Sequence, residues 1–72
     1  MTIRPRDWKQ HSRNERSITV AGRHFFASRC RVYWRVEEVD QAEPNGSRSI
    51  KVLRLNASTS DLSATVMKEC GL

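Results

Sequence analysis

The sequence has no long run of apolar residues, and this excludes a membrane-spanning helix. No apolar stretch in the 72 residues approaches the ~18 that such a helix requires. The first residues also lack the apolar segment of a secretory signal. We therefore expect a cytoplasmic protein that does not bind a membrane.

Cysteine and histidine are scarce, with two of each. His11 and His24 are thirteen residues apart and Cys30 and Cys70 are forty apart, which is unlike the short spacing of zinc motifs. The chain also lacks a glycine-rich phosphate loop and a nucleophile elbow. We expect no metal, no cofactor and no enzymatic activity. Reduced cysteines suit the cytoplasm, and a Cys30–Cys70 disulfide is the alternative.

The chain is short, and 38% of its residues are hydrophobic while 29% are charged. Seventy-two residues form one domain near the lower limit at which a single apolar core suffices. We therefore expect a folded protein with little stability to spare.

Charge is distributed unevenly along the chain, whose formal net charge is +5. Residues 1–35 hold nine basic and two acidic side chains, whereas residues 36–72 hold four basic and six acidic ones. Ten of the thirteen basic residues are arginine. Such asymmetry is typical of a protein that presents one side to a polyanion or an acidic partner. A charge that only maintains solubility is the alternative.

Residues 1–16 have the composition of a basic arm. Ile3 and Trp8 are their only large apolar side chains, and no apolar stripe at spacings of three and four follows Pro5. We predict a flexible arm, with Trp8 as a candidate contact to the core, ahead of a single domain over residues 17–72. The cations of the arm are Arg4, Arg6, Lys9, Arg13 and Arg16.

Residues 17–26 predict a β-hairpin. Ile18 and Val20 alternate with polar residues, and Ala21–Gly22 suits a two-residue turn because glycine adopts positive φ readily. The register of this turn places Ile18 opposite Phe25 on one face.

The second strand of that hairpin is predicted to continue to about Val39. Its later apolar side chains share one face, and they are Phe26, Cys30, Val32, Trp34 and Val36. Phe25 does not fit their parity, which indicates a bulge near residues 27–29. A different hairpin register is the competing explanation.

Residues 40–48 carry the strongest turn signal, because Pro44, Asn45 and Gly46 follow one another. A third strand is predicted over residues 49–56. Its apolar side chains point to both faces, which indicates a central strand or a second bulge.

The C-terminal residues predict one helix. A serine or threonine within residues 58–60 caps its start, and Gly71 supplies its stop. The predicted fold is α+β: a three-stranded antiparallel β-meander with this helix packed on the face of Trp34, preceded by the basic arm. The opposite face of the sheet stays open to solvent. The apolar residues of the helix recur with helical spacing, and they are Leu62, Val66, Met67 and Cys70.

The open face is predicted to carry a row of alternate residues, namely Arg29, Arg31, Tyr33 and Arg35. Arginine binds phosphate bidentately, and tyrosine stacks on a base or sugar. The five cations of the arm would follow a nucleic-acid backbone. We therefore expect a small non-catalytic protein that binds DNA or RNA phosphates through these nine residues, as a monomer or small homo-oligomer.

A protein partner is the second interpretation of the same surface. A small inhibitor or adaptor, of phage or mobile-element type, would dock its basic face onto an acidic surface of a larger nucleic-acid-handling machine. Arginines that only pair with nearby carboxylates and prevent strand edges from aggregating are a third explanation.

Overall fold

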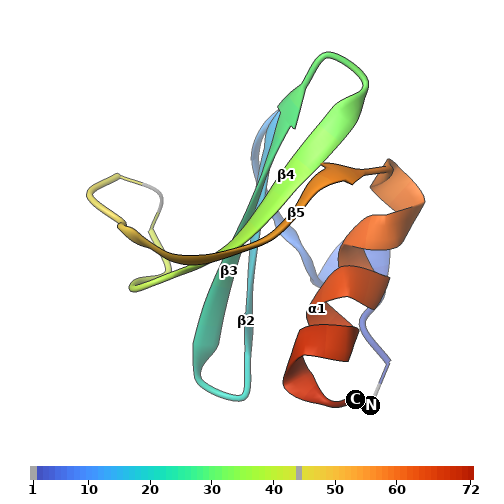
Figure 1. Cartoon of the computed structure of the whole chain (residues 1–72). Coiled ribbons are helices and arrows are strands. Elements are labelled where there is room, and N and C mark those ends of the chain that lie inside the picture. Colours follow the sequence, from blue (N-terminus) through green and yellow to red (C-terminus); the bar gives the residue numbers. More distant parts are fainter. Residues whose placement is uncertain (1, 44) are drawn as a thin grey trace.

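The structure of the chain, a computed structural model, describes residues 2–43 and 45–72. It is an α+β domain in which an antiparallel meander of five strands is followed by one helix (Figure 1). The expected class and the C-terminal helix are confirmed, whereas the expected number of three strands is wrong. The elements are η1 (Pro5–Asp7), β1 (Lys9–Ser12), β2 (Glu15–Val20), β3 (Arg23–Cys30), β4 (Tyr33–Val39), β5 (Ser49–Ala57), η2 (Thr59–Asp61) and α1 (Leu62–Cys70).

The first hairpin has the expected turn and register. Ala21 and Gly22 both have positive φ, at 51° and 77°, and they connect β2 to β3. Ile18 lies opposite Phe25 across the pair, so both side chains enter the core. Glycine adopts positive φ with little steric strain, so Gly22 favours this tight turn.

The long strand expected from Arg23 to Val39 is in fact two strands. Arg31 and Val32 form a turn between β3 and β4, and Arg31 has a φ of 62°. A positive φ is uncommon for a residue with a long side chain, and no glycine or asparagine marks the turn. This turn, and not a bulge near residues 27–29, resets which face each later side chain occupies.

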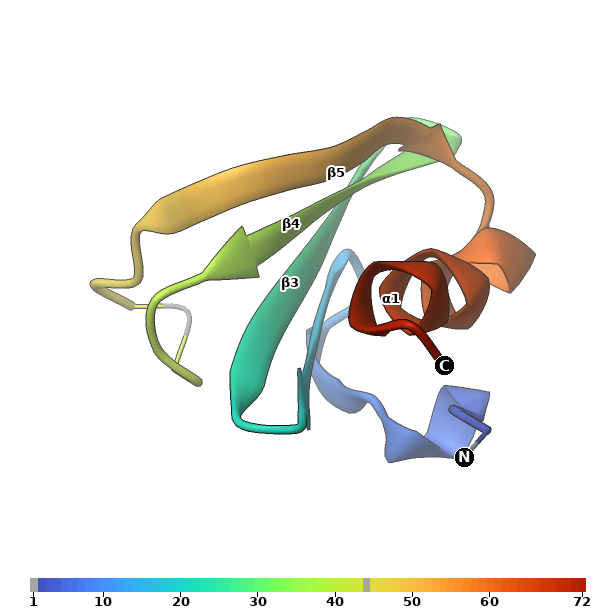
Figure 2. The ribbon, with the colours of Figure 1, turned by 60° about the horizontal axis from the view of Figure 1, so that its bottom comes forward.

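The N-terminal segment packs on the domain. Strand β1 pairs antiparallel with β2, and the preceding residues cross α1 as a strap, residues 2–8 (Figure 2). Ile3 and Trp8 are both buried in the core cluster. Trp8, the candidate contact to the core, is therefore part of it, and Ile3 is a second contact.

Helix α1 ends where the sequence indicates, whereas the expected serine cap lies at Ser58, ahead of the short turn η2 that leads into the helix. The backbone N–H and the hydroxyl of Ser58 both donate to Asp61 Oδ2, at 3.3 and 2.8 Å, in the turn that leads into the helix. These hydrogen bonds hold the pKa of Asp61 below its ordinary value. Gly71 ends the helix with a φ of 73°. Within the described ranges, no helix has the length and apolar character needed to span a membrane.

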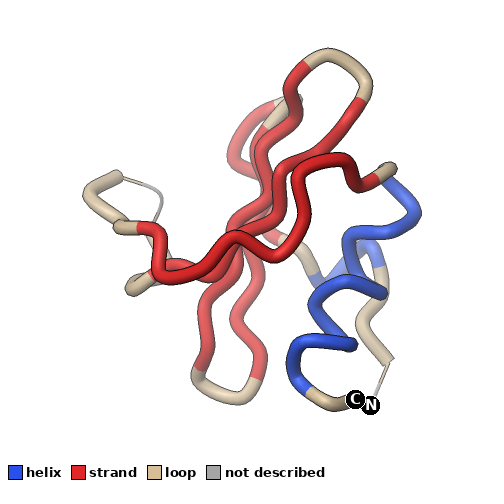
Figure 3. Tube along the Cα trace, viewed as in Figure 1, coloured by secondary structure: helices blue, strands red, loops and turns tan. Residues whose placement is uncertain are grey.

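The core lies between α1 and one face of the sheet (Figure 2). Figure 3 shows the helical segments together on one side of the strands. Trp34 and Val36 are buried there as expected, but Cys30 and Val32 are exposed. Cys30 ends β3 on the opposite face, where it pairs with Tyr33, and Val32 lies in the turn outside the sheet. The fully buried side chains of greatest volume are Trp34, Phe25, Leu62, Val36 and Val66.

Strand β5 is the second edge of the sheet, and its pairing with β4 is irregular. Register shifts occur on both sides of the Val36–Arg54 pair and again near Ser49. The interpretation of a bulged third strand is therefore confirmed, and the alternative of a central strand is wrong. In the preceding loop, Pro44 lies outside the described residues.

Candidate functional site

The four residues expected to form one row lie in three different settings. Arg29 pairs across the sheet with Trp34 and so belongs to the helix-side face. Tyr33 and Arg35 occupy the opposite, outer face, because they pair with Cys30 and Ser28. Arg31 lies in the turn between the strands. The predicted arginine ladder is therefore not formed, and the Arg31–Val32 turn is the physical reason.

A different group of arginines gathers where β3 turns into β4, at the top of Figure 1. The guanidinium carbons of Arg16 and Arg29 lie 5.0 and 5.8 Å from the ring centroid of Trp34. Because Trp34 is almost fully buried, its ring is a fixed support for both cations. Arg31 follows two residues after Arg29 in the turn.

The turn between β1 and β2 adds a further arginine to this group. The backbone N–H of Arg29 donates to the carbonyl oxygen of Asn14 at 2.8 Å, and its Nε donates to Asn14 Oδ1 at 3.2 Å. Arg13 is the residue before Asn14, so the turn brings it to the end of β3. We call this surface the basic end, and it consists of Arg13, Arg16, Arg29 and Arg31.

The basic end has no ion pair among the described residues, although carboxylates elsewhere are paired. Each of its four arginines lacks a carboxylate within ion-pair distance, and the Nε of Arg16 is buried without a hydrogen-bond partner. By contrast, Arg35 on the outer face has its Nε 3.0 Å from Glu37 Oε2. The charges of the basic end are therefore available to an external anion.

The cations of the N-terminal segment do not form one group. Arg13 and Arg16 belong to the basic end, whereas Arg4 and Arg6 are exposed on the strap along α1. Lys9 lies 3.8 Å from Glu43. The structure thus brings together two of these five cations with two of the expected row.

Sequence patterns missed this grouping because they missed the hairpin formed by β1 and β2. Asn14 is the one local sign of a turn there, because asparagine favours turns. The residues on either side of it include few apolar side chains, so no alternation marks them as strands. Without that turn, Arg13 and Arg16 cannot be placed next to Arg29.

Most acidic side chains lie in other parts of the domain. The exception is Glu15, which lies between Arg13 and Arg16 in the sequence and accepts a hydrogen bond from the Ser12 hydroxyl at 3.1 Å. Arg23 binds Glu38 of β4 at 2.7 Å and Glu69 of α1 at 2.9 Å, and Lys51 binds Glu69 at 3.2 Å. The Arg23 guanidinium holds the pKa of both Glu38 and Glu69 below their ordinary values, while the two carboxylates raise the pKa of Arg23. These groups stabilise one another and leave little charge for a ligand.

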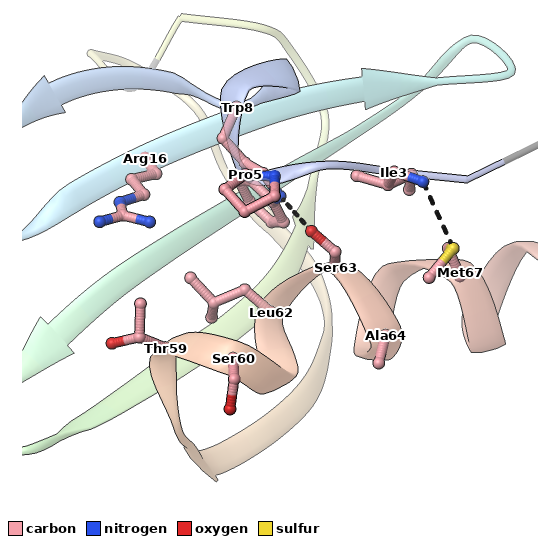
Figure 4. Close-up of a pocket in the computed structure, with 10 residues that line it drawn as sticks. All are labelled: Ile3, Pro5, Trp8, Arg16, Thr59, Ser60, Leu62, Ser63, Ala64 and Met67. Carbon is pink, nitrogen blue, oxygen red and sulfur yellow. Dashed lines mark hydrogen bonds between the residues drawn. The ribbon is translucent and has the colours of Figure 1, made fainter.

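A pocket of about 490 Å³ lies between the strap and the first half of α1 (Figure 4). Ile3, Trp8 and Met67 form much of its apolar wall, and Trp8 Nε1 donates to Ser63 Oγ at 3.0 Å. Arg16 lies at one end and connects the pocket to the basic end. The described residues that line it include no carboxylate, histidine or cysteine, so they supply no general acid or base.

One histidine–serine pair has the separation of a nucleophile and its base. His11 Nε2 lies 2.6 Å from Ser17 Oγ. Ser17 is only 8% exposed, and no described carboxylate is hydrogen-bonded to the His11 ring. A catalytic serine needs an accessible hydroxyl and an oriented base, so we interpret the pair as a structural link between β1 and β2. The described residues also contain no His, Cys, Asp or Glu cluster suited to a metal ion.

Comparison with protein-family models, with curated proteins and with solved structures finds no match to this chain.

Proposed function

We propose that the chain is a small non-catalytic nucleic-acid-binding protein that contacts phosphates through the basic end. The observation that supports this proposal is the group of four arginines without a carboxylate partner among the described residues. Arginine presents several donors in a planar fork that matches phosphate oxygens. Trp34 and Asn14 hold two of these side chains in place, which lowers the entropy lost on binding.

The test is a binding titration with labelled duplex DNA, single-stranded DNA and RNA at several salt concentrations. The variant combines Arg13→Gln, Arg29→Gln and Arg31→Gln. Arg16 is left intact because it is partly buried against Trp34. We expect weaker binding to all sequences and a salt-dependence slope lowered by about one unit per lost phosphate contact.

A matched control removes the same net charge elsewhere. Arg4, Arg6 and Arg48 are exposed and have no described ion pair, so their combined change to glutamine preserves the basic end. This control should retain most of the affinity. Equal losses in the two triple variants would mean that only net charge matters, and no binding at low salt would contradict the proposal.

A protein partner is the second candidate function, and one observation favours it. Val32 is 74% exposed in the same turn as Arg31, and exposed apolar side chains beside arginine are typical of protein interfaces. An inhibitor or adaptor would dock this turn onto an acidic surface with an apolar pocket. Val32→Ser should then weaken capture of a protein from lysate while leaving the binding of nucleic acid unchanged.

A further inference from the structure

The outer face of the sheet, opposite α1, differs in character between its two halves. Over β2 and β3 most of its side chains are polar, with Thr19 hydrogen-bonded to His24 and Ser17 to His11, and the half-buried Phe26 is the large apolar exception. Over β5 the exposed side chains are large and apolar. A solvated sheet face normally carries polar residues, so the half over β4 and β5 departs from that rule.

The apolar half is formed by three residues of β5 and one of β4. Val52 pairs with Glu37, whose neighbour Val36 is in the core, so Val52 lies on the outer face. Leu53 packs on the core, and the next residue, Arg54, pairs with Asp61 at the start of α1. Because these two successive residues both face α1, as in a bulge, Leu55 faces the outer side. The exposed fractions are 62% for Ile50, 42% for Val52, 68% for Leu55 and 56% for Tyr33.

No described element of the chain covers this surface. Figure 2 shows α1 and the strap together beneath the sheet, with the other side of β4 and β5 open. Large apolar side chains that cluster in this way on a small protein mark an interaction surface.

The charges of β5 favour a second copy of the chain as the occupant. Both cations of the strand are neutralised within the chain, because Lys51 binds Glu69 at 3.2 Å and Arg54 lies 3.5 Å from Asp61. On the outer face of the neighbouring strand β4, Arg35 is paired with Glu37. A twofold axis brings a surface against itself, so an uncharged surface meets its copy without repulsion. A charged partner would find no unpaired ion there among the described groups.

The bulges of β5 decide how two copies would meet. Register shifts along β5 disturb its free edge, and such bulges disfavour edge-to-edge pairing of strands. If the two outer faces pack together, the apolar side chains form the contact and the edge strands need not pair, as in a β-sandwich.

We propose that two copies of the chain form a weak homodimer by packing their β4–β5 outer faces together, with Val52 and Leu55 at the centre. This proposal is independent of the basic end and of nucleic acid. The face is about 30 Å long and about 10 Å wide, from the rise and spacing of strands. That is smaller than a standard interface of roughly 800 Å² per partner. The dimer is therefore weak, and we expect it to be populated only as the chain approaches millimolar concentration.

Sedimentation velocity of the full chain across a concentration series tests the proposal. The wild type should shift from monomer to dimer, and Leu55→Lys should weaken the dimer by at least about tenfold. Thr19→Lys is the matched control, because it adds the same charge to the polar half of the outer face. It should leave the dimer unchanged.

A second measurement locates the interface without any variant. Isotope-filtered NMR on a mixture of labelled and unlabelled chains should show contacts between copies at the methyl groups of Val52 and Leu55. A chain that stays monomeric at millimolar concentration would overturn the proposal. So would a dimer whose contacts lie elsewhere, or one that Thr19→Lys weakens as much as Leu55→Lys does.

Discussion

Trp34 is the residue on which the core and the basic end both depend. Its side chain is 1% exposed, and its Nε1 donates to Thr59 Oγ1 at 3.0 Å, just before α1. The same ring supports the guanidinium groups of Arg16 and Arg29. A change at this position therefore affects stability and the arrangement of cations together.

We expect Trp34→Ala to lower the free energy of unfolding by roughly 3–5 kcal/mol, because it leaves a large cavity in the core. Urea titration followed by far-UV circular dichroism measures this loss. Val32→Ala is the control, since Val32 is two residues away but exposed, and it should change stability by about 0.5 kcal/mol or less. Similar losses in both variants would contradict the assignment of faces.

At the scale of elements, the first hairpin and α1 could be predicted because a glycine marks each of them. Gly22 forms the turn between β2 and β3, and Gly71 ends the helix, both with positive φ. Alternation of Ile18 and Val20, and the spacing of Leu62 and Val66, then define the buried faces. Local signals of this kind are present in the sequence itself.

The turn between β3 and β4 and strand β1 could not be predicted in the same way. Arg31 adopts positive φ without being glycine or asparagine, so the stretch around it reads as one continuous strand. Strand β1 has four polar residues, and its place is fixed by pairing with β2. The basic end depends on both features, which is why sequence patterns placed Arg29 and Arg31 on the open face and left Arg13 and Arg16 in an arm.

Arg23 joins three elements through its two carboxylate partners. It lies in β3, Glu38 in β4 and Glu69 in α1. Both carboxylates have a pKa below their ordinary value of 4.5 in the folded chain, chiefly because they accept hydrogen bonds from Arg23. The folded state therefore binds fewer protons than the unfolded state in mildly acidic solution.

Stability should consequently fall as the pH drops below about 4.5 and should be fully present above it. Arg23→Gln should flatten this acid dependence, because the pKa of each carboxylate moves back toward its ordinary value. Urea midpoints between about pH 7 and about pH 3 measure the effect. Arg48→Gln is the control and should retain the wild-type dependence, since Arg48 has no described ion pair. An unchanged acid dependence in Arg23→Gln would contradict this account.

At the scale of the whole molecule, one group of arginines without ion-pair partners among the described residues lies at one end of the sheet. The basic end lies at the turn between β3 and β4, whereas farther along β4 the carboxylates are ion-paired, Glu37 with Arg35 and Glu38 with Arg23. A group of available cations steers the molecule toward a polyanion, which favours productive encounters at low salt. The outer-face dimer proposed above leaves both basic ends accessible, because they do not belong to the β4–β5 apolar surface.

The strap connects the beginning of the chain to its last helix. Trp8 is buried and donates to Ser63, while the backbone N–H of Ile3 donates to Met67 Sδ at 3.4 Å. We expect Trp8→Ala to lower the free energy of unfolding by roughly 3–5 kcal/mol. Thermal melting measures this change, with the exposed Arg6→Ala as a control that should cost about 0.5 kcal/mol or less. A Trp8→Ala variant as stable as the wild type would favour the interpretation of residues 1–16 as a flexible arm.

The strap also affects how fast the chain folds. Its two hydrogen bonds to α1 join residues 55 and 64 positions apart, so forming them in an unfolded chain would close a loop of nearly its whole length. Contacts of such long range cost loop entropy before they contribute energy, and they slow folding relative to helical proteins of this size. If they form after the rate-limiting step, loosening the strap accelerates unfolding and leaves the folding rate almost unchanged. The strap would then determine the lifetime of the native state.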